Sequence, residues 1–113
     1  MNQQERDEYL AIEWTGPGWK QLILDCDREM SAIDPEYTID QIKEKYGWLR
    51  YYIHSNSASY EDLWKITNRY ERLSMETCES CASTTDVTTA AGPFNSWIKT
   101  LCKACREKGN TDE

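Results

Sequence analysis

The chain has 113 residues, 29% of which are charged, and its formal net charge at neutral pH is −7. A chain of this length forms one small domain with a modest core, and its apolar runs fall short of the roughly 20 residues that a membrane span needs. The acidic charge argues against general electrostatic binding to nucleic acid, because a phosphate backbone attracts basic surfaces. The N-terminal residues show no basic and apolar signal region, so we expect a soluble protein of the cytoplasm.

The charge is uneven along the chain. Residues 1–40 contain ten acidic and three basic side chains, residues 41–77 five and six, and residues 78–113 five and four. The acidity of the first third is either a solvated surface or a face that meets a basic partner. The chain also contains five tryptophans and seven tyrosines, and such residues serve both in small cores and in binding surfaces.

Two helices are predicted in the first third. Residues 2–14 form a short helix, which the segment Thr15-Gly16-Pro17-Gly18 ends. A second helix begins near Trp19 and ends at Asp34. Its apolar stripe has helical spacing and consists of Trp19, Leu22, Ile23, Cys26 and Met30. The acidic residues that lie off this stripe are interpreted as a solvated face: Asp25, Asp27 and Glu29.

A β-hairpin is predicted next. Apolar and polar residues alternate over residues 48–54 with the period of a strand, and residues 37–44 form the opposing strand. Ile39 and Ile42 are three residues apart, which indicates either a bulge or helical spacing in the first strand. The turn is Glu44-Lys45-Tyr46-Gly47, where the final glycine can adopt a positive φ.

A third helix is predicted over residues 60–76. Ser59 stands where a capping residue is expected, with Asp62 as its partner in a capping box. The residues that we expect on the buried face of this helix are Tyr60, Leu63, Trp64, Thr67, Tyr70 and Leu73. The helix leads directly into the cysteines that follow.

Four of the five cysteines form two Cys-x-x-Cys pairs separated by twenty residues, a spacing typical of a zinc site. These cysteines are Cys78, Cys81, Cys102 and Cys105. We expect each pair to lie on a tight turn and the four sulfurs to hold one structural Zn²⁺ per chain, because a four-thiolate site leaves no open position for a substrate. The remaining cysteine, Cys26, is expected to be a small buried hydrophobe.

Three other uses of the cysteines have their own requirements. A pair of disulfides would need an oxidising compartment. A thioredoxin-type motif would follow a strand and open a helix in a βαβ unit, whereas Cys78 follows a predicted helix. An iron–sulfur centre also uses four cysteines, and the spacing alone does not exclude it.

The segment between the pairs has the layout of a zinc ribbon. Strands are expected over residues 84–89 and 97–101, with a turn over residues 90–96. The predicted fold is therefore α+β, with helices packed on a small β-hairpin and a C-terminal zinc ribbon. The expected division of the chain is a core over 1–77, a zinc module docked on it over 78–107 and a polar tail over 108–113.

Two segments carry a resemblance to a known family: KEKYGWLRYY, residues 43–52, and WIKTLCKAC, residues 97–105. Across residues 16–107 the chain resembles a family of small, mostly uncharacterised proteins of bacteriophages and prophages. Its members have a segment K-E-K-(F/Y)-G-x-L-R-(F/Y)-Y and end in a ribbon G-W-I-K-T-L-C-x-x-C. Residues 92–96 depart from this pattern, because the family often has a glycine directly before the tryptophan, and this puts the local turn in question. The resemblance implies a phage-encoded protein in the host cytoplasm and brings no enzyme class with it.

The hairpin is the best candidate for a binding surface, since it interleaves cations with aromatic rings. The candidate residues are Lys43, Lys45, Tyr46, Trp48, Arg50 and Tyr52. Such a mixture suits a protein hot spot, the stacking of a nucleotide base or the binding of a phosphate. The alternative is that Tyr46 and Trp48 pack on the helices while the lysines are solvated.

The chain shows no hydrolase, metalloprotease or phosphate-loop motif, and its one histidine, His54, is expected to be simply exposed. We therefore expect a non-catalytic protein that binds and modulates a host protein in transcription, replication or defence. One alternative is a protein that sequesters a small nucleotide to counter host defence. Another is a ribbon that binds nucleic acid through Lys99, Lys103, Arg106 and Lys108.

Overall fold

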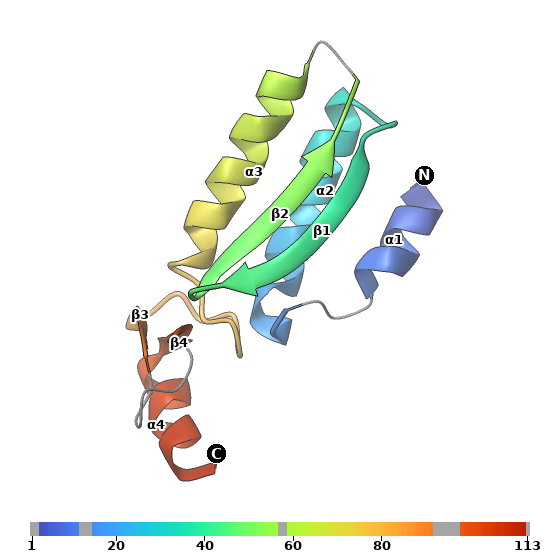
Figure 1. The fold of residues 1–113 in the computed structure, drawn as a ribbon. Coiled ribbons are helices and arrows are strands. Elements are labelled where there is room, and N and C mark those ends of the chain that lie inside the picture. Colours follow the sequence, from blue (N-terminus) through green and yellow to red (C-terminus); the bar gives the residue numbers. More distant parts are fainter. Residues whose placement is uncertain (1–2, 12–14, 57–58, 92–97, 113) are drawn as a thin grey trace.

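The computed structural model describes residues 3–11, 15–56, 59–91 and 98–112. In these ranges the chain is α+β, with helices and two antiparallel two-stranded sheets (Figure 1), which confirms the predicted fold class. A search of the same ranges finds no helix that is long and apolar enough to cross a membrane.

The N-terminal helices follow the predicted order. Helix α1 spans Gln3–Ala11, and the remainder of the helix expected over residues 2–14 lies outside the described residues. A 3₁₀ turn, η1 (Pro17–Trp19), leads into helix α2 (Lys20–Ile33). Proline suits the first turn of a helix, because its missing N–H would have had no partner within the helix.

The apolar stripe predicted for α2 is confirmed. Trp19, Cys26 and Met30 have no exposed surface and Ile23 is 6% exposed, while Leu22 packs against the core from a half-buried position. The helical spacing of apolar residues was sufficient to predict the buried side of α2, because this helix packs against the core along a single stripe.

Strands β1 (Thr38–Lys45) and β2 (Trp48–His54) form the predicted hairpin. They pair in antiparallel fashion, and a bulge interrupts the register between Ile39 and Gln41. The extra residue explains why the apolar spacing of the first strand departs from strict alternation.

The hairpin turns through two residues. Tyr46 and Gly47 have positive φ angles of 56° and 84°, as in type I′ turns, whose twist matches that of the flanking strands. The carboxylate of Glu44 accepts the N–H of Gly47 at 2.7 Å, which fixes the turn further.

Helix α3 spans Tyr60–Ser74, and its predicted buried face is only partly correct. Its buried residues are Leu63, Ile66, Thr67, Tyr70 and Ser74. Three residues expected on that face, Tyr60, Trp64 and Leu73, are instead 44%, 52% and 37% exposed. The reason is that α2 and β2 cover a narrower stripe of the helix than its apolar residues span, so the positions beside that stripe remain open.

The predicted capping box at the start of α3 is wrong. Ser59 is the N-cap residue, but its side chain makes no cap hydrogen bond. Its φ and ψ angles of −90° and 12° lie outside the extended region from which a side chain reaches back to the first N–H groups.

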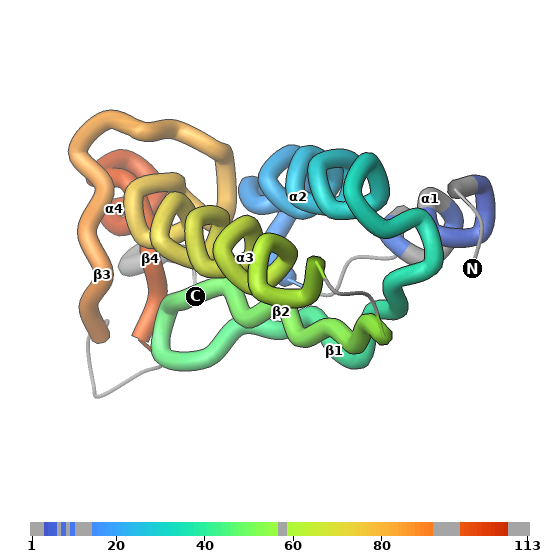
Figure 2. The backbone as a smooth tube through the Cα atoms, turned by 90° about the horizontal axis from the view of Figure 1, so that it is seen from above, coloured from blue at the N-terminus to red at the C-terminus, as the bar shows by residue number. Residues whose placement is uncertain are grey.

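The core lies between the two longer helices and one face of the hairpin. Helices α2 and α3 contact each other, and α3 contacts β2. Figures 1 and 2 show both helices on the same side of the β1–β2 sheet. The strand residues Ile42, Leu49 and Tyr51 face them and are at most 2% exposed. They alternate with residues of the opposite face, as in a sheet that is packed on one side only.

A polar network is buried within this core. Asp27, expected on a solvated face, is 1% exposed and forms an ion pair with Arg6 of α1 at 3.0 Å. The hydroxyl of Tyr37 donates to the carboxylate of Asp27, and the hydroxyls of Tyr37 and Tyr51 lie 2.9 Å apart. The prediction for Asp27 is therefore wrong. A buried carboxylate needs such partners, and these come from elements remote in the sequence.

The second sheet follows the first cysteine pair. Strands β3 (Val87–Ala91) and β4 (Ile98–Cys102) are antiparallel, as the ribbon layout predicts. Strand β3 begins later than expected, and the predicted turn, with its departure from the family pattern, falls largely outside the described residues. Helix α4 (Lys103–Asp112) follows, where the sequence predicts only a cysteine turn and polar residues.

Several contacts join the C-terminal elements to the helices and the hairpin. The indole N–H of Trp19 donates to the carbonyl of Thr77 at 2.9 Å. At the hairpin tip, the hydroxyl of Thr100 donates to the carbonyl of Gly47 at 2.6 Å. A Cβ atom on Gly47 would stand 2.8 Å from a methyl group of Thr89, so the tip approaches β3 this closely only because it is glycine.

Candidate metal centre

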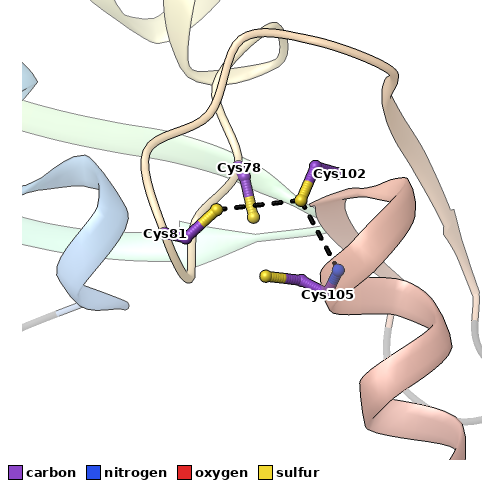
Figure 3. Close-up of side chains that lie close together, drawn as sticks. All are labelled: Cys78, Cys81, Cys102 and Cys105. Carbon is purple, nitrogen blue, oxygen red and sulfur yellow. Dashed lines mark hydrogen bonds between the residues drawn. The ribbon is translucent and has the colours of Figure 1, made fainter.

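Each cysteine of the two pairs lies at the boundary of an element. Cys78 and Cys81 lie in the loop after α3, Cys102 closes β4, and Cys105 is in the first turn of α4. Figure 3 shows the four side chains pointing toward one another from these elements. The antiparallel pairing of β3 and β4 thus brings together two pairs that are far apart in the sequence.

The first pair lies on the predicted tight turn. The N–H of Cys78 donates to the carbonyl of Ser83 at 2.8 Å, and the N–H of Ala82 donates to the carbonyl of Cys78 at 2.9 Å. Ala82 takes a φ of 72° to complete the turn. These bonds hold both sulfurs on the same side of the loop.

The cysteine loop is clamped from two sides by residues that the sequence analysis missed. The N–H of Gly18 donates to the carbonyl of Glu79 at 2.8 Å. Glu79 is also bonded to Thr100 twice, through its own N–H and through its carboxylate, both at 2.9 Å. A Cβ atom on Gly18 would stand 2.1 Å from the carbonyl oxygen of Cys78. The sequence indicates only that Gly18 ends a helix, although two glycines around one proline were a signal of close backbone approach.

The second pair differs from the predicted tight turn, because it spans the junction of β4 and α4. The sulfur of Cys102 accepts the N–H of Cys105 at 3.5 Å. A backbone hydrogen bond thus joins the two cysteines of this pair across the junction.

The sulfur positions fit one metal ion. All four Sγ atoms lie within 4.8 Å of one another, and those of Cys81 and Cys102 are 3.7 Å apart. A tetrahedral ion with metal–sulfur bonds of about 2.3 Å has sulfurs about 3.8 Å apart. The sulfurs of a disulfide are about 2.05 Å apart, so Cys81 and Cys102 are not bonded to each other. The four cysteines could therefore hold a metal ion.

The thiols influence one another's ionisation. Burial opposes the ionisation of Cys78, but backbone N–H groups of Cys102, Cys81 and Ser80 outweigh it and lower the pKa of Cys78 to about 7. Burial and hydrogen bonds to the neighbouring thiols raise the pKa of Cys105 to about 12. Four thiolates this close repel one another, so a cation is needed to keep all of them ionised at neutral pH.

The chemistry of the donor set points to a structural role. An ion bound by all four sulfurs has no open position for water or substrate, which catalytic metals keep. The fifth cysteine, Cys26, is not part of the cluster. It has no exposed surface on α2, and burial raises the pKa of its thiol, as expected of a packing residue.

The six hairpin candidates share one surface, which we call the hairpin outer face. The strand pairing places Lys43 opposite Arg50 and Lys45 opposite Trp48. These four residues and Tyr52 alternate with the buried strand residues, and therefore face away from the helices. Tyr46, in the turn, is 66% exposed. The alternative in which this tyrosine packs on the helices is therefore wrong.

Each cation of the hairpin outer face lies over an aromatic ring of the same face. The distances to the ring centroids are 5.9 Å for Lys43 over Tyr52, 5.9 Å for Lys45 over Tyr46 and 4.9 Å for Arg50 over Trp48. Such contacts are attractive within about 6 Å. They order long side chains that would otherwise be mobile in water.

His54 lies exposed at the end of β2, as expected.

Comparison with family models, with curated proteins and with solved structures gives no match for this chain.

Proposed function

We propose that this protein is a non-catalytic, zinc-binding accessory protein of a bacteriophage, which binds a host protein in the cytoplasm and modulates it. The contact is made by the hairpin outer face, and one structural zinc ion is held by the four-cysteine cluster. The resemblance of residues 16–107 to phage and prophage proteins supports the source of the chain, and the acidic first third and the many tryptophans and tyrosines support a protein partner.

Zinc is the ion that suits the cysteine cluster best. A tetrahedral set of four thiolates is typical of zinc or of iron. The ligands of an iron–sulfur cluster bind different iron atoms, so their sulfurs lie further apart than the sulfurs around a single ion. The spread of at most 4.8 Å supports a single ion. Cys81 is exposed, and zinc, which has no redox chemistry, tolerates exposure better than iron.

The hairpin outer face is the observation that carries the proposed binding role. It combines cations with aromatic rings. These side chains alternate with the buried strand residues and so face away from α2 and α3, which lie together on the other side of the sheet (Figure 2). Tyr46 and Tyr52 are 66% and 42% exposed, and exposed tyrosines and arginines supply much of the energy of protein contacts. Because the cations already lie over rings, they lose less freedom when a partner binds.

The four-cysteine cluster is connected to the hairpin outer face through strand β4. Thr100, two residues before Cys102 on β4, donates its hydroxyl to the carbonyl of Gly47. Binding of the ion orients β4, and β4 in turn holds the turn next to Lys45 and Tyr46. The proposed zinc ion therefore affects partner binding by holding the hairpin turn in place, and it does not contact the partner itself.

The test combines capture from a host lysate with a double variant of the hairpin tip. Nuclease-treated wild-type protein is expected to retain one host protein in stoichiometric amount, identified by mass spectrometry. Lys45→Glu with Tyr46→Asn reverses a charge and removes a ring, while Asn-Gly is the preferred sequence of this turn. We expect the variant to lose about nine-tenths of the captured protein and to keep its melting temperature and one zinc per chain.

A matched control is Lys103→Glu, which makes the same charge reversal at an exposed position of α4 and should retain the partner. The proposal fails if the tip variant captures as much host protein as the wild type. It also fails if nuclease releases every partner, or if only a small nucleotide is retained. Metal analysis that finds iron instead of zinc would overturn the assignment of the ion.

A further inference from the structure

Helix α3 carries a second row of side chains beside its buried stripe. Tyr60, Trp64, Asn68 and Glu71 follow one another at intervals of three or four residues, so they share one face of the helix. Tyr60 and Trp64 are 44% and 52% exposed. Large aromatic side chains that are exposed together are typical of interaction sites.

This row borders a groove between α3 and β2, with a volume of about 670 Å³. That is the size of many ligand sites. The side chains that matter for its chemistry are Asp40, Arg50, Tyr52, Tyr60, Trp64 and Glu71. The groove therefore brings three aromatic rings and three charged groups to one place.

On the sheet side, the groove is lined by Asp40 and Gln41 of β1 and by residues of β2, whose other edge does not pair with β1. The hydroxyl of Ser74 accepts the N–H of Leu49, and Oε2 of Glu71 accepts the N–H of Tyr51, both at 3.0 Å. These bonds protect the edge from pairing with another strand. A ligand therefore enters the groove with a side chain and does not extend the sheet.

The charges in the groove favour a cation. The carboxylates of Asp40 and Glu71 outnumber the guanidinium of Arg50, which already lies over the ring of Trp48. Burial raises the pKa of the Glu71 carboxyl, although the N–H of Tyr51 and the charge of Arg50 oppose the rise. A half-buried carboxylate of this kind is stabilised by a further positive charge beside it.

The rings on the helix side have room for that charge. Among the described residues, no cation lies over Tyr60 or Trp64, whereas Lys43 lies over Tyr52 at 5.9 Å. The face of an aromatic ring attracts a cation, and the attraction grows when water is excluded. A groove offers that exclusion and a flat surface does not.

We propose that this groove binds the side chain of a lysine or arginine in an exposed segment of a partner protein, held between the rings of Tyr60 and Trp64 and the carboxylates of Asp40 and Glu71. The inference deepens the proposed function, on which it rests for the partner being a protein. The net charge of −7 also favours the approach of a basic segment.

The test uses the full-length, metal-loaded chain and a short glycine–serine peptide that contains lysines. The same peptide with glutamine in place of each lysine is the comparison. Binding is measured by nuclear magnetic resonance, with the backbone N–H of Asn68, which lines the groove and is unchanged in every variant, as the reporter. We expect the lysine peptide to bind about tenfold more tightly than the glutamine peptide, as a desolvated cation over aromatic rings predicts.

Two variants of the groove locate the site. Glu71→Gln removes the charge but keeps an oxygen that can accept the N–H of Tyr51, so the fold is preserved. Trp64→Ser removes an exposed ring. Each is expected to weaken binding of the lysine peptide about tenfold. Glu36→Gln makes the same change of net charge at an exposed position outside the groove and should bind as the wild type does.

Equal binding of the two peptides, or wild-type affinity in both groove variants, would overturn the inference. The tip variant, Lys45→Glu with Tyr46→Asn, separates this site from the hairpin tip, because neither residue lines the groove. It should bind the lysine peptide normally, and loss of peptide binding in this variant also counts against the groove. If host capture survives in the tip variant but is lost with Trp64→Ser, the proposed contact face fails while the groove stands.

Discussion

The ion pair of Arg6 and Asp27 is buried in the core, where two charged side chains need hydrogen-bond partners. The two side chains are 2% and 1% exposed. Arg6 also donates to the carbonyl of Pro35 at 3.0 Å, and the hydroxyl of Tyr37 donates to Asp27. Together with the buried Leu10, this pair holds α1 against the rest of the fold.

Replacing Arg6 with alanine is expected to lower the free energy of unfolding by about 3 kcal/mol, because the carboxylate of Asp27 would stay buried without its cation. Urea unfolding followed by circular dichroism measures the change. Arg28→Ala is the control, since Arg28 pairs with Asp25 at 4.0 Å on the exposed side of α2 and should contribute less than about 1 kcal/mol. Equal losses in the two variants would contradict the burial of the Arg6 pair.

The sequence alone predicts the four candidate metal ligands, but it does not predict the residues that hold the cysteine loop in place. The spacing of Cys78, Cys81, Cys102 and Cys105 is specific, because two short Cys-x-x-Cys turns have few other uses. The clamp by Gly18 and Glu79 could not be predicted, because it depends on where the start of α2 lies relative to a loop some sixty residues later. The burial of Asp27 was missed for the same reason.

At the level of elements, periodicity predicts those helices and strands whose formation depends on residues close together in the sequence. Helix α2 and the β1–β2 hairpin lie close to their predicted bounds, because a stripe or an alternation is a local pattern. The exposure of Tyr60 and Trp64 was not predictable from α3 alone, since the position of β2 decides which part of a broad apolar face is covered. Helix α4 was not predicted, because it lacks an apolar stripe. It begins at Lys103, directly after Cys102 ends β4.

The contact between η1 and the cysteine loop gives a second prediction. Gly18→Ala is expected to destabilise the protein by about 2 kcal/mol and to speed the loss of metal to a chelator, because the new methyl group would collide with the loop backbone. Unfolding in urea and the absorbance of a metal indicator measure the two effects. Ser80→Ala, an exposed change within the same loop, should alter neither. Wild-type behaviour of the Gly18 variant would mean that the two segments are not in contact.

The molecule as a whole is elongated, with extents of 47 × 25 × 23 Å, and the four-cysteine cluster lies where the helices and the hairpin meet β4 and α4. Among the described residues, the bonds across this joint include those from Trp19 to Thr77, from Gly18 to Glu79 and from Thr100 to Gly47. Order at the hairpin tip therefore depends on order in the metal module.

Removal of the metal, or Cys102→Ser, should separate these parts. We expect amide hydrogen exchange to rise in the cysteine loop, in β3 and β4, and at Gly47, because metal binding supplies folding free energy to a small module. Protection at Leu49 and Leu63, buried in the main core, should persist. Cys26→Ala is the control and should keep its metal. A Cys102→Ser protein that retains the ion would disprove the four-cysteine assignment.

The division of the ligands between two distant pairs also sets an order of events during synthesis. The ribosome releases the chain from its N-terminus, and the hairpin with its helices can assemble from residues already made. Cys102 and Cys105 are made after Cys78 and Cys81, and so is Thr100, the partner of Gly47. The proposed metal site can therefore be completed only after the second cysteine pair has been made. A chain cut short before β4 would carry unpaired thiols at Cys78 and Cys81 and an unsupported hairpin tip.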